Sequence, residues 1–158
     1  MRGCAVIGAA LLCLPLGFCA WITWDEPRSA LPSEVEWTDI IGFDSQSGFR
    51  EGCGFGAYRI SSDNAAAFAS ASFNAPKWRQ TPLTIEDGQY AFVGPAQERV
   101  TLYALHATGC ASDDLRKTSS QMYKALSNSG SWYHIYNHGE GLVVVDPSAQ
   151  LAWYLYYG

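Results

Sequence analysis

The feature that most constrains this chain is a long uncharged run near its N-terminus. From Cys4 to Trp24 the sequence reads CAVIGAALLCLPLGFCAWITW, without one acidic or basic side chain. A helix needs about 20 such residues to cross a bilayer. Arg2 precedes the run and Asp25 follows it, a charge order that leaves the N-terminus in the cytoplasm. The run therefore predicts that residues 25–158 are exported.

The same run admits three fates, which the sequence leaves open. It is a retained transmembrane anchor, a signal peptide cut after Cys19, or a lipoprotein leader acylated at Cys19. Phe18 fits the lipoprotein pattern poorly, because that position normally holds a small residue. We expect a membrane-anchored, extracytoplasmic domain that is periplasmic if the protein is bacterial, or a secreted domain if the segment is removed.

Cysteine positions are consistent with export. Three of the five cysteines lie inside the apolar run, which leaves Cys53 and Cys110 in the exported part. Two cysteines in an oxidising compartment favour one disulfide. By chain-entropy arithmetic a link of this span would stabilise the fold by about 4 kcal/mol. No set of residues has the spacing of a metal site, and we expect neither a metal nor a cofactor.

Charge is distributed unevenly along the exported part. Residues 25–51 carry seven acids and two bases, whereas residues 52–158 carry eight acids and seven bases. The sequence thus predicts an anchor or signal at 1–24, an acidic juxtamembrane linker at 25–51 and a folded domain at 52–158. The acidic segment would also suit a basic protein partner. A nucleic-acid partner is not expected, since such binding needs clustered Lys and Arg.

The folded part predicts an α+β domain, with two helices on one face of an antiparallel sheet. One helix starts from a cap within 61–64 and the other from a cap at 112–114. Each helix is followed by three strand candidates. This repeated order indicates either a duplicated αβββ unit or a chance similarity between two segments. The strand candidates are 54–60, 83–86, 89–93, 99–106, 131–136, 141–145 and 150–157.

The C-terminal strand is apolar on both sides. Trp153 and Leu155 alternate with Tyr154 and Tyr156, so the two pairs face opposite ways. One side can build a core, while the tyrosines of the other side need a further covering surface. We predict that Tyr154 and Tyr156, with Tyr133 and Tyr103, bind a partner. The alternative is that residues 33–50 cover them.

Catalytic motifs are sparse. The loop Asn137-His138-Gly139-Glu140 brings an imidazole and a carboxylate close together, but the same pattern makes an ordinary turn. The chain contains no HExxH, GxSxG, P-loop or paired CxxC motif. We therefore predict no catalytic residues and expect a non-enzymatic protein.

The sequence as a whole favours a small exported binding domain that acts by protein–protein interaction. An inhibitor or immunity-like protein of a bacterial envelope is the most concrete form of this prediction. Two alternatives remain, namely an extracytoplasmic hydrolase that uses His138 and Glu140, or His134, and a structural envelope component.

Overall fold

The structure is a computed structural model that describes residues 27–47, 52–83, 85–86, 90–93, 98–101 and 103–158. The chain divides into two compact units, residues 1–32 and residues 33–158. In the first unit the described part is helical at residues 27–29. No helix within the described ranges is long and apolar enough to span a membrane. The predicted apolar helix at 1–24 lies outside the described residues.

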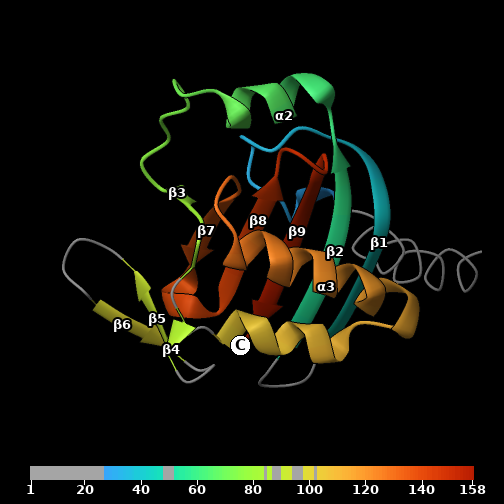
Figure 1. Ribbon diagram of the computed structural model, residues 1–158. Helices are drawn as coiled ribbons and strands as arrows, with labels where there is room; N and C mark the ends of the chain where they lie inside the picture. Colours follow the sequence, from blue (N-terminus) through green and yellow to red (C-terminus); the bar gives the residue numbers. More distant parts are fainter. Residues whose placement is uncertain (1–26, 48–51, 84, 87–89, 94–97, 102) are drawn as a thin grey trace, which may run out of the picture. The chain divides into compact units, whose positions relative to one another are not determined.

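The second unit is built on a six-stranded antiparallel sheet with a few helices beside it, which confirms the α+β class (Figure 1). The strand order is β1-β2-β9-β8-β7-β3. These strands are β1 (Trp37–Ser47), β2 (Gly52–Ile60), β3 (Arg79–Gln80), β7 (Trp132–Tyr136), β8 (Gly141–Asp146) and β9 (Leu151–Tyr157). A separate three-stranded sheet contains β4 (Ile85–Glu86), β5 (Tyr90–Val93) and β6 (Glu98–Thr101).

Part of the segment predicted as a linker belongs to the sheet. Strand β1 pairs antiparallel with β2, and the compact unit begins at Ser33. The physical reason is the apolar content of β1, because Trp37, Ile40 and Phe43 are all partly buried. Asp39 is exposed, and Asp44 is partly buried like Phe43. The apolar side chains of the segment therefore join the sheet even though its overall charge favours a linker.

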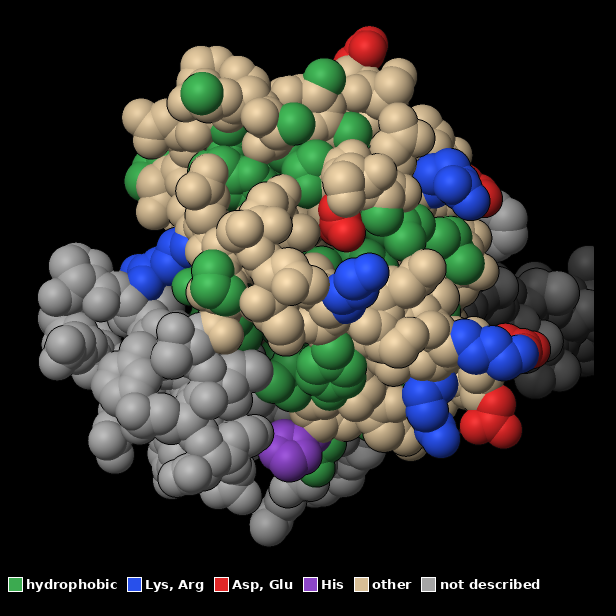
Figure 2. Space-filling view, viewed as in Figure 1, with side chains coloured by type: hydrophobic (Ala, Val, Ile, Leu, Met, Phe, Trp, Pro, Cys, Tyr) green, Lys and Arg blue, Asp and Glu red, His purple; other side chains and the backbone are tan. Residues whose placement is uncertain are grey.

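One face of the sheet is closed by helix α3 (Asp113–Ser127), which crosses in front of the strands in Figure 1. The predicted apolar stripe of this helix is confirmed, because Leu115, Met122, Ala125 and Leu126 are buried. They pack with Phe55 of β2, Val144 of β8, and Trp153 and Leu155 of β9, all fully buried. We call this side the α3 face. From this side, hydrophobic side chains show only as separate patches among polar ones (Figure 2).

A second element on the α3 face corrects the sequence prediction. Residues 99–106 were expected to form one strand, but the chain changes after β6 into the 3₁₀ helix η1 (Tyr103–Cys110). Ala104 and Ala107 are fully buried at one-turn spacing in η1. Small side chains at that spacing allow the backbone to lie close against the sheet, which favours the helical turn over an extended strand.

The predicted disulfide is present and ties η1 to the sheet. Cys53 of β2 is bonded to Cys110, the last residue of η1, with 6.4 Å between the Cα atoms. The two residues are 57 positions apart in the sequence. The link therefore holds the covering element against the edge of the α3 face.

Contrary to the sequence prediction, the first helix does not lie on the α3 face. Helix α2 (Ser62–Ala69) begins at the N-cap Ser61, whose hydroxyl accepts from the Asn64 backbone N–H. Its Phe68 carbonyl accepts a 2.7 Å hydrogen bond from the Trp132 indole, and Trp132 belongs to the opposite face of the sheet. A helix of eight residues that follows β2 after a single residue packs at the strand ends instead of crossing the sheet.

Four described strands, β3 to β6, follow α2, whereas three, β7 to β9, follow α3, and the two sets contribute differently to the two sheets. The strands after α3 complete the six-stranded sheet, whereas β4, β5 and β6 form the separate one. A duplicated unit therefore stays a prediction that these described elements do not test.

Candidate binding surface

Strand register brings a group of aromatic side chains together on the sheet face opposite α3. His134 of β7 lies opposite Val143 of β8, which lies opposite Tyr154 of β9. The next row on the same side runs from Tyr136 through Gly141 to Tyr156. We call this side the tyrosine face and define it by Phe43, Tyr58, His134, Tyr136, Tyr154 and Tyr156.

Glycines make room for these rings. A Cβ atom at Gly141 would lie 2.1 Å from the Tyr136 ring, and one at Gly56 would lie 2.7 Å from Phe43 and from Tyr58. At Gly54 the corresponding distance to the Tyr154 ring is 3.3 Å. Side chains at Gly141 and Gly56 would displace the rings, so these residues let the aromatic groups lie flat along the sheet.

Strand β1 contributes to the tyrosine face from its edge. Phe43 stacks on Tyr154 with ring centroids 5.9 Å apart, and Trp37 lies 6.2 Å from Tyr58. Tyr58 is fully buried, whereas Tyr154 and Tyr156 remain partly accessible. Residues of the 33–50 segment thus cover part of this face, as the alternative interpretation of the sequence expected, while two tyrosines keep an accessible surface.

The Tyr136 hydroxyl has an unusual environment. Burial raises the pKa of this phenol far above its ordinary value, and the nearby phenol oxygens of Tyr154, Tyr156 and Tyr58 oppose its ionisation further. The hydroxyl is buried, and hydrogen bonding with Tyr154 is among the causes of the raised pKa.

Two buried nitrogen atoms lie in rings near Tyr136. His134 Nδ1 and Trp78 Nε1 make no hydrogen bond, and their rings lie 5.6 Å apart. The His134 ring lies 5.9 Å from the Tyr136 ring. Burial lowers the pKa of His134, the positive charge of Lys77 lowers it further, and Glu34 acts in the opposite direction. The imidazole is therefore neutral at pH 7 and offers one donor and one acceptor.

The predicted binding residues are only partly brought together. Tyr154 and Tyr156 lie on the tyrosine face, but Tyr133 lies opposite Val144 on the α3 face and is 5% exposed. Tyr103 belongs to η1, and its side chain is outside the described set. The sequence analysis missed Tyr136. Alternation in WYHIY separates residues 132, 134 and 136 from Tyr133, but only the strand register shows which set faces Tyr154.

The His138–Glu140 loop forms the short 3₁₀ helix η2 (Asn137–Gly139) and the start of β8. The His138 side chain lies outside the described set, so its predicted pairing with Glu140 is not tested. The Glu140 carbonyl accepts a 2.8 Å hydrogen bond from Tyr157, and its carboxylate lies beside Gly158. Within the described residues no group of His, Cys, Asp and Glu has the arrangement of a metal site.

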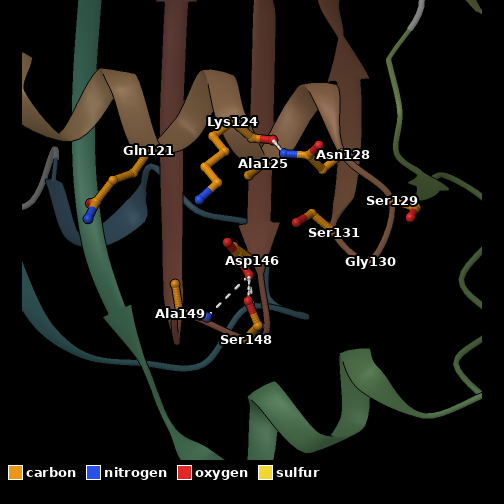
Figure 3. A pocket seen from close by; sticks show the side chains of 10 residues that line it. All are labelled: Gln121, Lys124, Ala125, Asn128, Ser129, Gly130, Ser131, Asp146, Ser148 and Ala149. Atoms are coloured by element: carbon orange, nitrogen blue, oxygen red, sulfur yellow. Dashed lines mark hydrogen bonds between the residues drawn. The ribbon is translucent and has the colours of Figure 1, made fainter.

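A polar hollow of about 420 Å³ lies between α3 and the β8–β9 turn (Figure 3). Its side chains are largely committed to local structure. One Asp146 carboxylate oxygen accepts from the Ser148 and Ala149 backbone N–H groups at 2.9 and 3.2 Å and from the Ser148 hydroxyl. The Lys124 side chain extends across the hollow toward Asp146 (Figure 3). This arrangement is that of an Asx turn beside a helix end.

The fold and this surface define an α+β domain with one closed sheet face and one half-covered aromatic face. Comparison of the chain with models of protein families, with curated proteins and with solved structures found no match in any of the three.

Proposed function

We propose that this protein is an exported binding domain that contacts a partner protein through its tyrosine face. The observation that supports it best is the aromatic cluster itself, in which Phe43 stacks on Tyr154 while Tyr154 and Tyr156 stay partly accessible. Large aromatic groups at a surface are enriched where proteins bind one another. A partner that packs on these two tyrosines would cover the part of the face that strand β1 leaves accessible.

The chemistry of the surface favours a protein partner. Tyr and Trp supply large contact areas together with a polar group, and they are enriched where interfaces are strongest. The chain carries a net charge of −5, which opposes binding to the phosphate backbone of nucleic acids. A basic protein is the partner best matched to this charge.

The proposed location follows from the uncharged N-terminal run. In the proposal, residues 4–24 hold the domain on the outer side of a membrane, or direct its secretion if they are removed. In a bacterial envelope this would be a periplasmic inhibitor or immunity-like protein. Two alternatives are separated from binding by the test below. One is a hydrolase that uses His138 and Glu140, or His134, and the other is a structural envelope component.

The test is capture of partners from detergent-solubilised envelope with the full chain. Tyr154→Ala and Tyr156→Ala should each weaken capture of a stoichiometric partner, by about 1–3 kcal/mol in binding free energy. Tyr123→Ala is the matched control, because Tyr123 is an exposed tyrosine of α3, 39% accessible, away from the tyrosine face.

Thermal unfolding of the same variants distinguishes binding from packing. If Tyr154 and Tyr156 serve mainly to complete the fold, their alanine variants lose stability and keep full partner affinity, which would contradict the proposal. Normal folding with loss of an enzymatic activity in His138→Ala and Glu140→Ala would instead favour the hydrolase.

A further inference from the structure

The polar hollow between α3 and the β8–β9 turn brings two opposite charges to face one another (Figure 3). Lys124 enters it from the last turn of α3, and Asp146 enters it from the end of β8. The Lys124 side chain extends toward the carboxylate, yet among the described residues no ion pair joins the two groups. Lys117 on the same helix, by contrast, lies 2.7 Å from the carboxylate of Asp114. The hollow therefore holds a cation and an anion apart, where one ligand can contact both.

The Asp146 carboxylate keeps one oxygen available to such a ligand. One oxygen accepts all three hydrogen bonds of the turn, from the backbone N–H groups of Ser148 and Ala149 and from the Ser148 hydroxyl. The second oxygen accepts none from the described part of the chain, and in Figure 3 it is directed toward Lys124. An ionised carboxylate accepts hydrogen bonds at both oxygens. The turn thus fixes the position of the carboxylate and leaves half of its capacity unused.

Ser131 provides an independent indication of a ligand. This residue is only 5% exposed, yet it lines the hollow, and its hydroxyl points into it (Figure 3). Its backbone N–H and carbonyl are both bonded to Thr81, whereas the hydroxyl makes no hydrogen bond to any described residue. Buried polar side chains are nearly always hydrogen-bonded. A ligand in the hollow would supply the bond that this hydroxyl lacks.

The composition of the hollow indicates which class of ligand it fits. Its volume of about 420 Å³ lies within the usual range for small-molecule sites, about 300–1,000 Å³. Lys124 and Asp146 are the charged residues among the described groups that line it, so its net charge is zero. No aromatic ring on which a sugar could stack is among these lining residues. A small molecule that carries both charges matches this lining better than a sugar or a simple ion does.

We propose that the hollow binds a small zwitterion of the amino-acid type. Its carboxylate accepts from the Lys124 ammonium and the Ser131 hydroxyl, and its ammonium group donates to the unused oxygen of Asp146. Both ligand charges are then matched by side chains that the fold already holds in place. This site is separate from the tyrosine face and does not depend on the function proposed for that face.

Nuclear magnetic resonance titration of the ¹⁵N-labelled full chain in detergent micelles tests the ligand class. The zwitterionic probes are glycine, β-alanine and γ-aminobutyrate, which separate the two charges by increasing distances. Acetate and methylammonium carry one charge each, and glucose carries none. At constant pH and ionic strength, at least one zwitterion should cause saturable shifts at the amides of residues 129–131 and 148–149. The other three compounds should bind at least ~10-fold more weakly, because each lacks one or both ion pairs.

Protein variants test the location. Asp146→Asn keeps an oxygen that accepts the turn bonds but removes the charge, and Lys124→Gln removes the cation at an exposed helix position. Each should weaken zwitterion binding at least ~5-fold. Lys117→Gln and Asp63→Asn are the matched controls, because they make the same changes outside the hollow. Ser131→Ala should weaken binding ~3–10-fold with little change in thermal stability, since its hydroxyl bonds to no described residue.

Tyr154→Ala should leave zwitterion binding unchanged, so this proposal and the one for the tyrosine face can fail separately. The present proposal is overturned if none of the three zwitterions causes saturable shifts at the amides of the hollow. It is equally overturned if acetate, methylammonium or glucose binds as tightly as the best zwitterion, or if the Lys124 and Asp146 variants bind like their controls.

Discussion

The two faces of the six-stranded sheet differ in how completely other elements cover them. On the α3 face, Phe55, Trp153 and Leu155 are fully buried beneath a helix and a disulfide-linked 3₁₀ turn. On the tyrosine face, glycines leave room for rings, and Tyr154 and Tyr156 stay partly accessible beside the edge strand β1. The difference indicates that stability comes mainly from one face, which leaves the other available for contact.

Replacement of Trp153 with alanine should have the largest effect and test this division most severely. Its side chain is fully buried at the centre of the α3 face. We expect a loss of about 3–5 kcal/mol in the free energy of unfolding, measured by urea denaturation. Tyr156→Ala on the other face should lose much less. Equal losses for the two variants would show that both faces serve stability alike.

The disulfide should have the next largest effect. Because the Cys53–Cys110 bond restricts the unfolded chain, the double variant Cys53→Ala with Cys110→Ala should lose about 2–4 kcal/mol of stability. Wild-type protein unfolded in the presence of a reductant should show a similar loss and supplies the control. A much larger loss in the variant alone would mean that the thiols pack as well as crosslink.

Tyr136→Phe tests the environment of one buried hydroxyl on the tyrosine face. It removes a buried hydroxyl that interacts with the phenol of Tyr154, so stability at pH 7 should fall by about 1 kcal/mol, the usual net contribution of a hydrogen bond and far less than the loss in Trp153→Ala. Since burial raises the Tyr136 pKa, the folded state keeps its proton at a pH where the unfolded chain releases it.

The wild type should therefore lose stability above about pH 10, the ordinary tyrosine pKa, and the loss should be shallower in Tyr136→Phe. Urea denaturation at pH 9 and pH 11 measures this difference. Tyr123→Phe should behave as the wild type. Parallel losses in all three proteins would contradict the assigned environment of Tyr136.

His134 should give the smallest effect and the opposite pH dependence. Burial lowers its pKa, so below the ordinary value of about 6.5 the unfolded chain binds a proton that the folded protein does not. Stability should fall as the pH drops from 7.5 to 5, and His134→Gln should reduce that fall. The control is His106→Gln, because His106 lies exposed in η1, outside the tyrosine face. Nuclear magnetic resonance titration of the imidazole checks the pKa directly.

Several elements of the fold could be predicted because their signals are local. The alternation in β9 correctly separates Trp153 and Leu155 from Tyr154 and Tyr156, since a strand repeats every second residue. The apolar spacing of α3 and the Ser61 cap of α2 are equally local. The Cys53–Cys110 pairing followed from the count of cysteines outside the apolar run.

Other elements depended on contacts with the rest of the fold. The acidic stretch around β1 is a strand because it pairs with β2, which begins at Gly52, and β2 is itself held in the sheet by β9. The η1 turn depends on a sheet surface against which two buried alanines can pack. Propensity alone favoured a strand there, and tertiary packing overrode it.

The sequence by itself therefore determined the uncharged N-terminal run, the α+β class, the disulfide and the two sides of β9. Only the tertiary structure decided which other residues join Tyr154 and Tyr156. Tyr133 and Tyr136 look equally suitable in the sequence, yet register places the first beside Val144 on the α3 face and the second opposite Gly141 on the tyrosine face. The physical reason is that a strand's periodicity sorts its residues into two sets, while the face to which each set belongs is decided by pairing with neighbouring strands.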